Sequence, residues 1–258
     1  MSDDTYFEAV AEVARVVGEA AMVHYHLGFE VEFKKDGSPV TIADRSAEQA
    51  ARRMVERLFP EDGFIGEEFP PTHPHAKRQW IVDPIDGTKS FVRRVPLWGS
   101  LVAVAEGETI LAGSVFLPAV GELVVAAPGR GCWWNGSRCS VSDVSRLDAA
   151  IALTSQLPFG GSAPQIAGWH ALEQKIHTGR TWGDCFGYLM VATGRAEIMV
   201  DSAVSPWDIA ALLPIVAEAG GVFTDWTGTS TAFGGNAIAT NAALAEETRL
   251  VLTSQVRS

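Results

Sequence analysis

The sequence predicts a layered α/β protein of the α+β kind, with a mostly antiparallel sheet flanked by two N-terminal helices and followed by a smaller α/β layer. Three observations predict this fold. Apolar residues recur at helical spacing over 3–27 and 41–59, and strand-like runs separated by turn residues fill 98–134. Beyond about residue 148, strands and helices alternate. We therefore expect two subdomains, an N-terminal one over 1–147 and a C-terminal one over 148–258.

Composition and charge narrow the class of protein. The chain has 258 residues, of which 47% are apolar and 20% charged, as in an ordinary globular protein. Its formal net charge of −11 argues against a nucleic-acid partner, because binding a phosphate backbone requires a basic surface. The acidic start is unlike a signal peptide, and no apolar run has membrane-spanning length. The 3 cysteines fit neither a metal-binding pattern nor a paired disulfide framework, so we expect free thiols and a cytoplasmic protein.

The second helix, over about 41–59, carries the first candidate site residue. It starts at Thr41, and Asp44 follows three residues later, as in a capping box. Asp44 also lies at the N-terminal end of the apolar stripe of this helix. It is therefore either a capping acid that interacts with the helix dipole, or an acid that points inward toward a metal-bound water. The local pattern leaves both interpretations open.

A second group of acids follows a short apolar stretch at 63–66. Glu67 and Glu68 come directly after it. A pair of glutamates in a loop is usually solvated, but these residues end a strand-like run sixteen residues before Asp83. They are thus a candidate second source of metal ligands. The following segment, 70–75, is typical of an exposed loop.

The stretch 79–92 organises the predicted site. An apolar run ends in Asp83 and Asp86, and Pro84 between them stiffens the turn by fixing φ. Two carboxylates this close repel each other unless a cation lies between them, and hard oxygen ligands favour Mg²⁺. Gly87 and Thr88 then open a short helix, whose first amides can bind an anion. Cations beside a phosphate-binding turn indicate phosphoryl chemistry.

The remaining elements follow in order. Strands are expected at 100–105, 110–117, 123–127 and near Trp133, with a tight turn at Asn135-Gly136. The C-terminal half is expected to contain strands at 150–155, 180–182, 222–224 and 237–240 and helices at 169–177, 185–193, 206–219 and 242–254. Asp208 lies in the first turn of an otherwise apolar helix, where an acid is either a capping residue or a ligand.

Four blocks of residues occur together in the order and approximate spacing of a known family. They are Asp44, Gly66-Glu67-Glu68, Asp83-Pro84-Ile85-Asp86-Gly87-Thr88 and Trp207-Asp208-Ile209-Ala210. Over nearly its whole length the chain resembles the inositol monophosphatase family, and the joint occurrence of the blocks is specific although each alone is weak. The resemblance implies an αβαβα sandwich, a homodimer, and an enzyme that hydrolyses a small phosphate monoester with two or three Mg²⁺ ions per active site.

The resemblance also implies a set of metal ligands. Glu67, Asp83 and the carbonyl of Ile85 would bind the first ion. Asp83, Asp86 and Asp208 would bind the second, so that Asp83 bridges the two. Glu67 would in addition hold a third, weaker ion through water.

Roles in catalysis are carried over in the same way. Asp44 and Thr88 resemble the pair that orients and deprotonates the attacking water, and we count Glu67 with them as catalytic. A threonine hydroxyl is a poor base, so it needs Asp44 to accept its proton or hydrogen bond. The amides of Gly87 and Thr88 would receive the phosphate.

Within the family, the sequence is similar to the bacterial histidinol-phosphate phosphatases at 88–93, 183–188 and 204–208. Arg180 and Asn241 match possible substrate contacts. Histidinol phosphate carries an ammonium group and an imidazole, so its pocket should contain uncompensated acids, and Asp184 and Asp201 are the candidates. Asp201 stands where the family has a longer Glu, and Arg94 stands where a Gly is typical.

The favoured reaction is hydrolysis of L-histidinol phosphate to L-histidinol and phosphate, a step of histidine biosynthesis. An inositol-1-phosphate or other polyol monophosphatase is the alternative on the same machinery. Bisphosphate phosphatases fit less well, because the chain shows no added basic patch for a second phosphate. A non-catalytic phosphate- or metal-binding protein would be expected to lose Asp44, Glu67 or Thr88, and all three are present.

Overall fold

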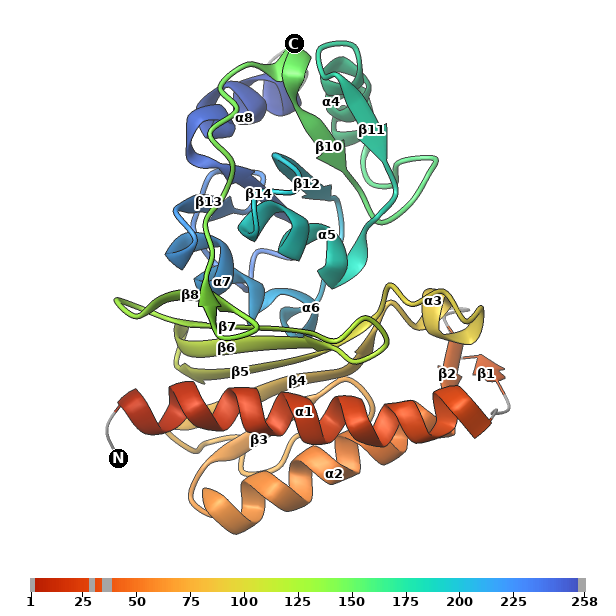
Figure 1. Cartoon of the computed structure of the whole chain (residues 1–258), viewed down its shortest axis with the longest axis vertical. Helices are drawn as coiled ribbons and strands as arrows, with labels where there is room; N and C mark the ends of the chain where they lie inside the picture. The colour runs from red at the N-terminus through yellow and green to blue at the C-terminus, as the bar shows by residue number, and fades with distance from the viewer. Residues whose placement is uncertain (1–2, 28–30, 34–38, 255–258) are drawn as a thin grey trace.

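The computed structural model describes residues 3–27, 31–33 and 39–254, and arranges them in five alternating layers (Figure 1). Helices α1 (Asp3–Leu27) and α2 (Ile42–Leu58) cover one face of a seven-stranded sheet. The next three layers are a group of middle helices, a five-stranded sheet and an outer pair of helices. The middle helices are α5 (Asp184–Ala192), α6 (Pro206–Ile209) and α7 (Leu212–Glu218), and the outer pair is α4 (Ala163–Glu173) and α8 (Ala245–Thr253). The predicted layered α/β fold is confirmed.

The seven-stranded sheet has the order β3-β4-β5-β6-β7-β8-β9 and is antiparallel except for the parallel pair β3–β4. Its strands are β3 (Gly63–Gly66), β4 (Arg78–Asp86), β5 (Gly99–Glu106), β6 (Thr109–Leu117), β7 (Glu122–Ala127), β8 (Gly131–Trp134) and β9 (Ser137–Arg138). Near-continuous apolar runs such as 101–105 are buried on both faces, because helices cover both sides of the sheet.

The five-stranded sheet has the order β11-β10-β12-β14-β13. Its strands are β10 (Ile151–Leu153), β11 (Thr178–Arg180), β12 (Ile198–Asp201), β13 (Gly221–Thr224) and β14 (Ala237–Asn241). Strands β11, β10 and β12 are parallel to one another, whereas β14 and β13 run antiparallel. The carboxyl ends of β10 and β12 therefore meet at one edge of the sheet, which is where a pocket lies.

Local sequence explains where the N-terminal helices begin and what they bury. At the start of α2, the Thr41 hydroxyl accepts the Ala43 amide and the Asp44 carboxylate accepts the Thr41 amide, so the predicted capping box is present. Small residues on both helices, Ala14 and Ala47 among them, are fully buried and allow close packing. The helices share one core with the outer face of the seven-stranded sheet.

Several C-terminal elements differ from expectation. The expected helix 206–219 is two helices, because Pro214 has no amide to bond to the carbonyl of Ala210 and its ring would clash there. Helix α4 begins at Ala163 rather than at 169, with Ser162 as a capping residue. Strand β12 was not expected from the sequence.

Smaller differences occur elsewhere. Two short strands, β1 (Val31–Phe33) and β2 (Pro39–Thr41), pair before α2, and the turn-rich segment 34–38 lies outside the described residues. A short helix α3 (Thr88–Val92) follows β4 as expected. The last expected helix is divided into a 3₁₀ turn over 242–244 and α8.

The strands of the two sheets occupy separate parts of the sequence, before residue 139 and after residue 150. On this basis we propose that 1–147 and 148–258 are subdomains that complete one site. None of the described helices is long and apolar enough to cross a membrane.

Candidate active site

The end of β4 contains a bulge that places Asp83 and Asp86 on one side of the sheet. Asp83 pairs with Leu101 of β5 and Asp86 pairs with Gly99, so β4 has one extra residue between them. In a regular strand, residues three positions apart point to opposite faces, and the extra residue brings them back to the same face. The Ile85 amide donates to Asp83 Oδ1 at 2.9 Å, which fixes this turn.

Two neighbouring elements add acids to the same place. Because β3 runs parallel to β4 and Gly66 pairs with Val82, Glu67 emerges beside Asp83. Asp208 arrives from the first turn of α6, where its carboxylate accepts the Ser205 amide at 2.7 Å. One carboxylate oxygen from each of Asp83, Asp86 and Asp208 lies within 4.8 Å of the others.

The electrostatics of this cluster fit a divalent cation. Burial raises the pKa of Asp83 well above its ordinary value, and the charges of Glu67 and Asp86 raise it further. Burial likewise raises the pKa of Asp86, with contributions from Asp184 and Asp208. Burial raises the pKa of Asp208 to about 6, although the Ser205 amide opposes that shift. Carboxylates that repel each other at this range, without a soft ligand among them, suit a hard cation such as Mg²⁺.

Asp44 and Thr88 lie at the edge of the cluster. Asp44 is 1% exposed, and its carboxylate accepts both the amide and the hydroxyl of Thr41 at 2.7 Å. Burial raises its pKa to about 6 against these hydrogen bonds, and Glu67 adds to the rise. The Thr88 hydroxyl donates to the Ile85 carbonyl at 3.0 Å. Asp44 is thus a capping acid that also faces the acid cluster, so the two interpretations from sequence are compatible.

The turn between β4 and α3 requires a glycine. Gly87 has φ +83°, in the left-handed region. A Cβ at this position would lie 3.1 Å from the Leu97 carbonyl oxygen and 3.2 Å from Asp184 Oδ2. The backbone of Gly87 therefore lies directly against Asp184 of the opposite layer.

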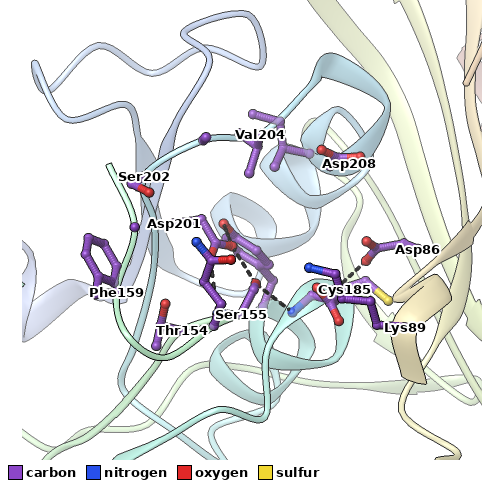
Figure 2. Close-up of a pocket in the computed structure, with 16 residues that line it drawn as sticks. Asp86, Lys89, Thr154, Ser155, Phe159, Cys185, Asp201, Ser202, Val204 and Asp208 are labelled. Carbon is purple, nitrogen blue, oxygen red and sulfur yellow. Dashed lines mark hydrogen bonds between the residues drawn. The ribbon is translucent and has the colours of Figure 1, made fainter. Parts of the chain in front are cut away.

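A pocket of about 280 Å³ extends from the acid cluster between the two sheets. Figure 2 shows Asp86, Asp208 and Lys89 at one side of it, and Thr154, Phe159 and Ser202 at the other. Asp184 and Asp201 also line it.

The two pocket acids have different surroundings. Asp184 has φ +52°, and its amide donates to the Ser155 hydroxyl at 2.9 Å. Burial raises the pKa of Asp184 to about 7, Asp201 adds to the rise, and Lys89 opposes it. Asp201 is 7% exposed, and its carboxylate accepts the Ser155 amide and hydroxyl and the Tyr188 hydroxyl at 2.9–3.2 Å.

Comparison with known proteins agrees with this geometry. The chain matches the inositol monophosphatase family over residues 2–257. The chain belongs to the inositol monophosphatase family. It is 40% identical to a histidinol-phosphatase of Mycobacterium tuberculosis over 254 residues, which cover 96% of this chain and 97% of the relative. It is also 40% identical to a histidinol-phosphatase of Chlorobaculum parvum, with 84% of each chain covered.

A solved structure has the same fold. The crystal structure of the extragenic suppressor protein suhB from Bartonella henselae superposes with a TM-score of 0.89 at 27% identity, covering 95% of this chain and 97% of that one. This likeness covers nearly the whole chain, so it includes elements of all five layers.

Two residues that were predicted to contact the substrate do not line the pocket beside the acid cluster. Arg180, at the end of β11, is exposed and lines a separate hollow beside Trp169 and Glu173. Asn241 is 0% exposed, and its side-chain oxygen accepts the Leu244 amide while its nitrogen donates to Val144 O at 2.7 Å. Asn241 thus has a structural role in this structure, since it closes the turn after β14.

The sequence analysis did not predict two of the residues that line this pocket. Lys89 and Ser155 face the pocket acids, although neither belongs to the acidic pattern. A signal for Ser155 was available, because it ends the strand expected at 150–155 and parallel strands present their carboxyl ends at one edge. Nothing in the sequence near Lys89 indicates that Asp184 lies close to it.

Proposed function

We propose that this chain is a divalent-cation-dependent phosphomonoesterase whose preferred substrate is L-histidinol phosphate, which it hydrolyses to L-histidinol and phosphate. The observation that carries the proposal is the pocket, which joins the acid cluster at one end to two further carboxylates, the half-buried Asp184 and the buried Asp201. Such a pocket suits an ester with a phosphate at one end and positive charge at the other. The relatives named histidinol-phosphatases, at 40% identity, support the same assignment.

Two or three Mg²⁺ ions would be held by the acids of the cluster. Glu67, Asp83 and the Ile85 carbonyl would form one set of ligands, and Asp83, Asp86 and Asp208 a second set that shares Asp83. A cation bound there supplies Lewis acidity toward the phosphate and lowers the pKa of a bound water. The protein's part is to hold these oxygens in place before the substrate arrives.

Binding and activation would use the turn after β4. The Gly87 and Thr88 amides would hold the phosphate, and Thr88 would orient the attacking water through its hydroxyl. Asp44 has a pKa raised to about 6 by burial, so it is suited to accept a proton near neutral pH. Glu67 would assist by fixing a second water.

The organic half of the substrate would lie toward Asp184. An ammonium group beside Asp184 favours its ionised form, which burial disfavours in the free protein. Asp201 would act mainly by holding Ser155 and Tyr188, because its carboxylate already accepts hydrogen bonds from both. Arg180 and Asn241 do not line this pocket, so we propose no contact between them and the substrate.

One observation favours the polyol alternative. Lys89 lies beside Asp184 and compensates part of its charge, and the hydroxyl of Ser202 also lines the pocket. A neutral polyol phosphate, such as inositol-1-phosphate, could hydrogen-bond to these groups.

A phosphate-release panel tests the proposal. The protein is assayed with Mg²⁺ on L-histidinol phosphate, inositol-1-phosphate and adenosine 3′,5′-bisphosphate, with Asp83→Asn as the inactive control. We expect the highest kcat/KM on histidinol phosphate. Faster turnover of inositol-1-phosphate would select the polyol function, and no release from any substrate would indicate a binding protein. We further propose a homodimer, which light scattering after size-exclusion chromatography checks directly.

A further inference from the structure

An ion pair joins two residues of α2, the buried Glu48 and the partly exposed Arg52. Glu48 is on α2, one turn after Asp44, and its side chain is 0% exposed. Its Oε1 accepts the Arg52 Nε at 2.8 Å and lies 2.7 Å from the Arg52 Nη2. A carboxylate removed from water in this way is costly unless its partners are well placed, so the contacts it makes are informative.

The second oxygen of Glu48 holds the loop that carries Glu67. The Glu68 amide donates to Glu48 Oε2 at 2.7 Å. A Cβ at Gly66 would lie 2.3 Å from the Glu48 carboxylate, so the loop backbone lies directly against this group and a larger residue would displace it. Residues on both sides of Glu67 in the sequence are therefore fixed against one buried carboxylate.

Arg52 holds the same loop from its far end. Its Nη2 donates to the Phe69 carbonyl at 3.1 Å. The guanidinium carbon lies 4.5 Å from the centre of the Phe64 ring and 5.9 Å from that of Phe69. The side chain is thus held between two aromatic rings on either side of the loop, where cation–π attraction restricts it.

We infer that Glu48 and Arg52 are positioning residues that set the affinity of the site for a divalent cation by fixing the backbone of Glu67. The inference rests on the proposed function, in which Glu67 is a cation ligand. Partners that orient a ligand contribute to metal affinity without touching the ion, and losing one costs about 10–100-fold. Neither residue lines the pocket, so the affinity for the organic part of the substrate should not depend on them.

Glu48→Gln tests this inference. The variant has nearly the same volume, but its amide nitrogen cannot accept a hydrogen bond, so either the Arg52 or the Glu68 contact is lost. We expect the half-saturating Mg²⁺ concentration to rise about 10-fold, while kcat and KM at saturating Mg²⁺ stay within about 2-fold. Direct Mg²⁺ titration by calorimetry, and the rise in Tm on adding Mg²⁺, should show the same loss of affinity without substrate.

Glu56→Gln is the matched control. It removes the same charge from an exposed position on α2 and should leave the Mg²⁺ dependence unchanged. Arg52→Lys keeps the positive charge, but its single amino group cannot bond to both Glu48 and Phe69. This variant provides the same test if Glu48→Gln does not fold. We expect the double variant to be no worse than the worse single variant, because the two residues act as one unit.

Glu67→Gln distinguishes a wrong ligand assignment from a wrong positioning role of Glu48 and Arg52. If Glu67→Gln weakens Mg²⁺ binding and Glu48→Gln and Arg52→Lys do not, the inference is wrong and the proposed ligands stand. If Glu67→Gln leaves Mg²⁺ binding unchanged, the ligand assignment fails and the inference fails with it. A lower Tm of metal-free Glu48→Gln with unchanged Mg²⁺ affinity would show a structural role alone and also overturn the inference.

Discussion

The buried acids of the site differ in what surrounds their charge. Asp44 and Asp201 accept hydrogen bonds from hydroxyls of the chain itself, Thr41 for one and Ser155 and Tyr188 for the other. The charges that act on Asp83 are instead those of other acids. Burial is the largest cause of its raised pKa, and these charges raise the pKa further. An acid whose neighbouring charges are other acids gains most from a cation.

Asp83→Asn should therefore have the largest effect of any ligand substitution. The change removes charge from two proposed ions at once, so turnover should be abolished at any practical Mg²⁺ concentration. Asp208→Asn should act through one ion and be partly rescued by added Mg²⁺. Steady-state rates measured against Mg²⁺ concentration check both. Near-normal turnover by Asp83→Asn would exclude the bridging role.

Thr88→Ala tests the activation of water. Loss of the hydroxyl should lower kcat by about 10² or more, the usual scale of a positioned acid–base group, with a smaller change in KM. Thr88→Ser keeps the hydroxyl and should retain most of the rate. If Thr88→Ala instead raises KM and leaves kcat intact, Thr88 only holds the phosphate.

Asp184→Asn and Asp201→Asn test how the organic half is recognised. A charge-assisted hydrogen bond to an ammonium contributes roughly 1.5–3 kcal/mol, so Asp184→Asn should lower kcat/KM on histidinol phosphate by about 10–100-fold. Inositol-1-phosphate should be affected far less. Asp201→Asn should lower both, because it loosens Ser155 and Tyr188. Equal losses on both substrates in Asp184→Asn would contradict a cationic substrate.

Individual residues were predictable where the chemistry is local in sequence. Asp83 and Asp86 lie in one turn, so their two carboxylates predict a cation site from the local sequence alone. Lys89 faces Asp184 only because two distant layers meet, and no local pattern contains that information. Asn241 was assigned to the substrate, but its side chain bonds to Leu244 in its own turn and to Val144 in a distant segment of the chain.

At the scale of the element, the turn after β4 depends on backbone conformations that most residues avoid. Gly87 has φ +83° and Arg94, after α3, has φ +61°. The family resemblance predicts a glycine at the position of Arg94, and this left-handed conformation suits glycine, since an L-residue there is strained. The short helix α3 is thus bounded on both sides by left-handed residues.

Gly87→Ala should destabilise the protein and disturb the site. The left-handed conformation costs about 1–2 kcal/mol for an L-residue, and the close Leu97 carbonyl and Asp184 carboxylate add to this. Gly121→Ala is the matched control, because Gly121 has φ +71° with nothing within 4 Å of the added Cβ. Urea unfolding should show a larger loss for Gly87→Ala, and only that variant should lose activity. Equal losses would mean that crowding at Gly87 is unimportant.

The elements themselves were predictable in proportion to the strength of their periodicity. α1 and α2 have long apolar stripes and were predicted to within a residue or two. Strand β12 has a continuous apolar run, which resembles a buried helix segment as much as a strand. The start of α4 was missed because Gly168 interrupts the pattern. In the fold that glycine allows the backbone of Leu252 to approach, since an added Cβ would lie 2.1 Å from its carbonyl oxygen.

At the scale of the whole molecule, the acid cluster makes stability depend on pH. Burial raises the pKa of Asp44 and Asp208 to about 6, and that of Asp184 to about 7, from an ordinary value of 3.8. Between about pH 4 and pH 7 the folded metal-free protein thus binds more protons than the unfolded chain. Its free energy of unfolding should fall as pH rises through that window.

Urea unfolding in EDTA at pH 5 and pH 8 measures this effect. We expect the metal-free protein to be less stable at pH 8, and saturating Mg²⁺ to remove most of the difference by favouring the ionised carboxylates. Metal-free Asp208→Asn should show a weaker pH dependence. Greater stability of the metal-free protein at pH 8 than at pH 5 would contradict the assignment of these pKa shifts.

The division of the site between the two sheets has a consequence for how specificity evolves. Apart from Asp208, the proposed ligands come from β4 and from the loop after β3, whereas the far wall of the pocket comes from the ends of β10 and β12 and from α5. Most of the proposed metal ligands and most of the residues of the far pocket wall thus lie in different segments of the sequence. Mutations in the far pocket wall can therefore change which phosphate ester is bound, while the metal ligands of β4 and of the loop after β3 stay the same.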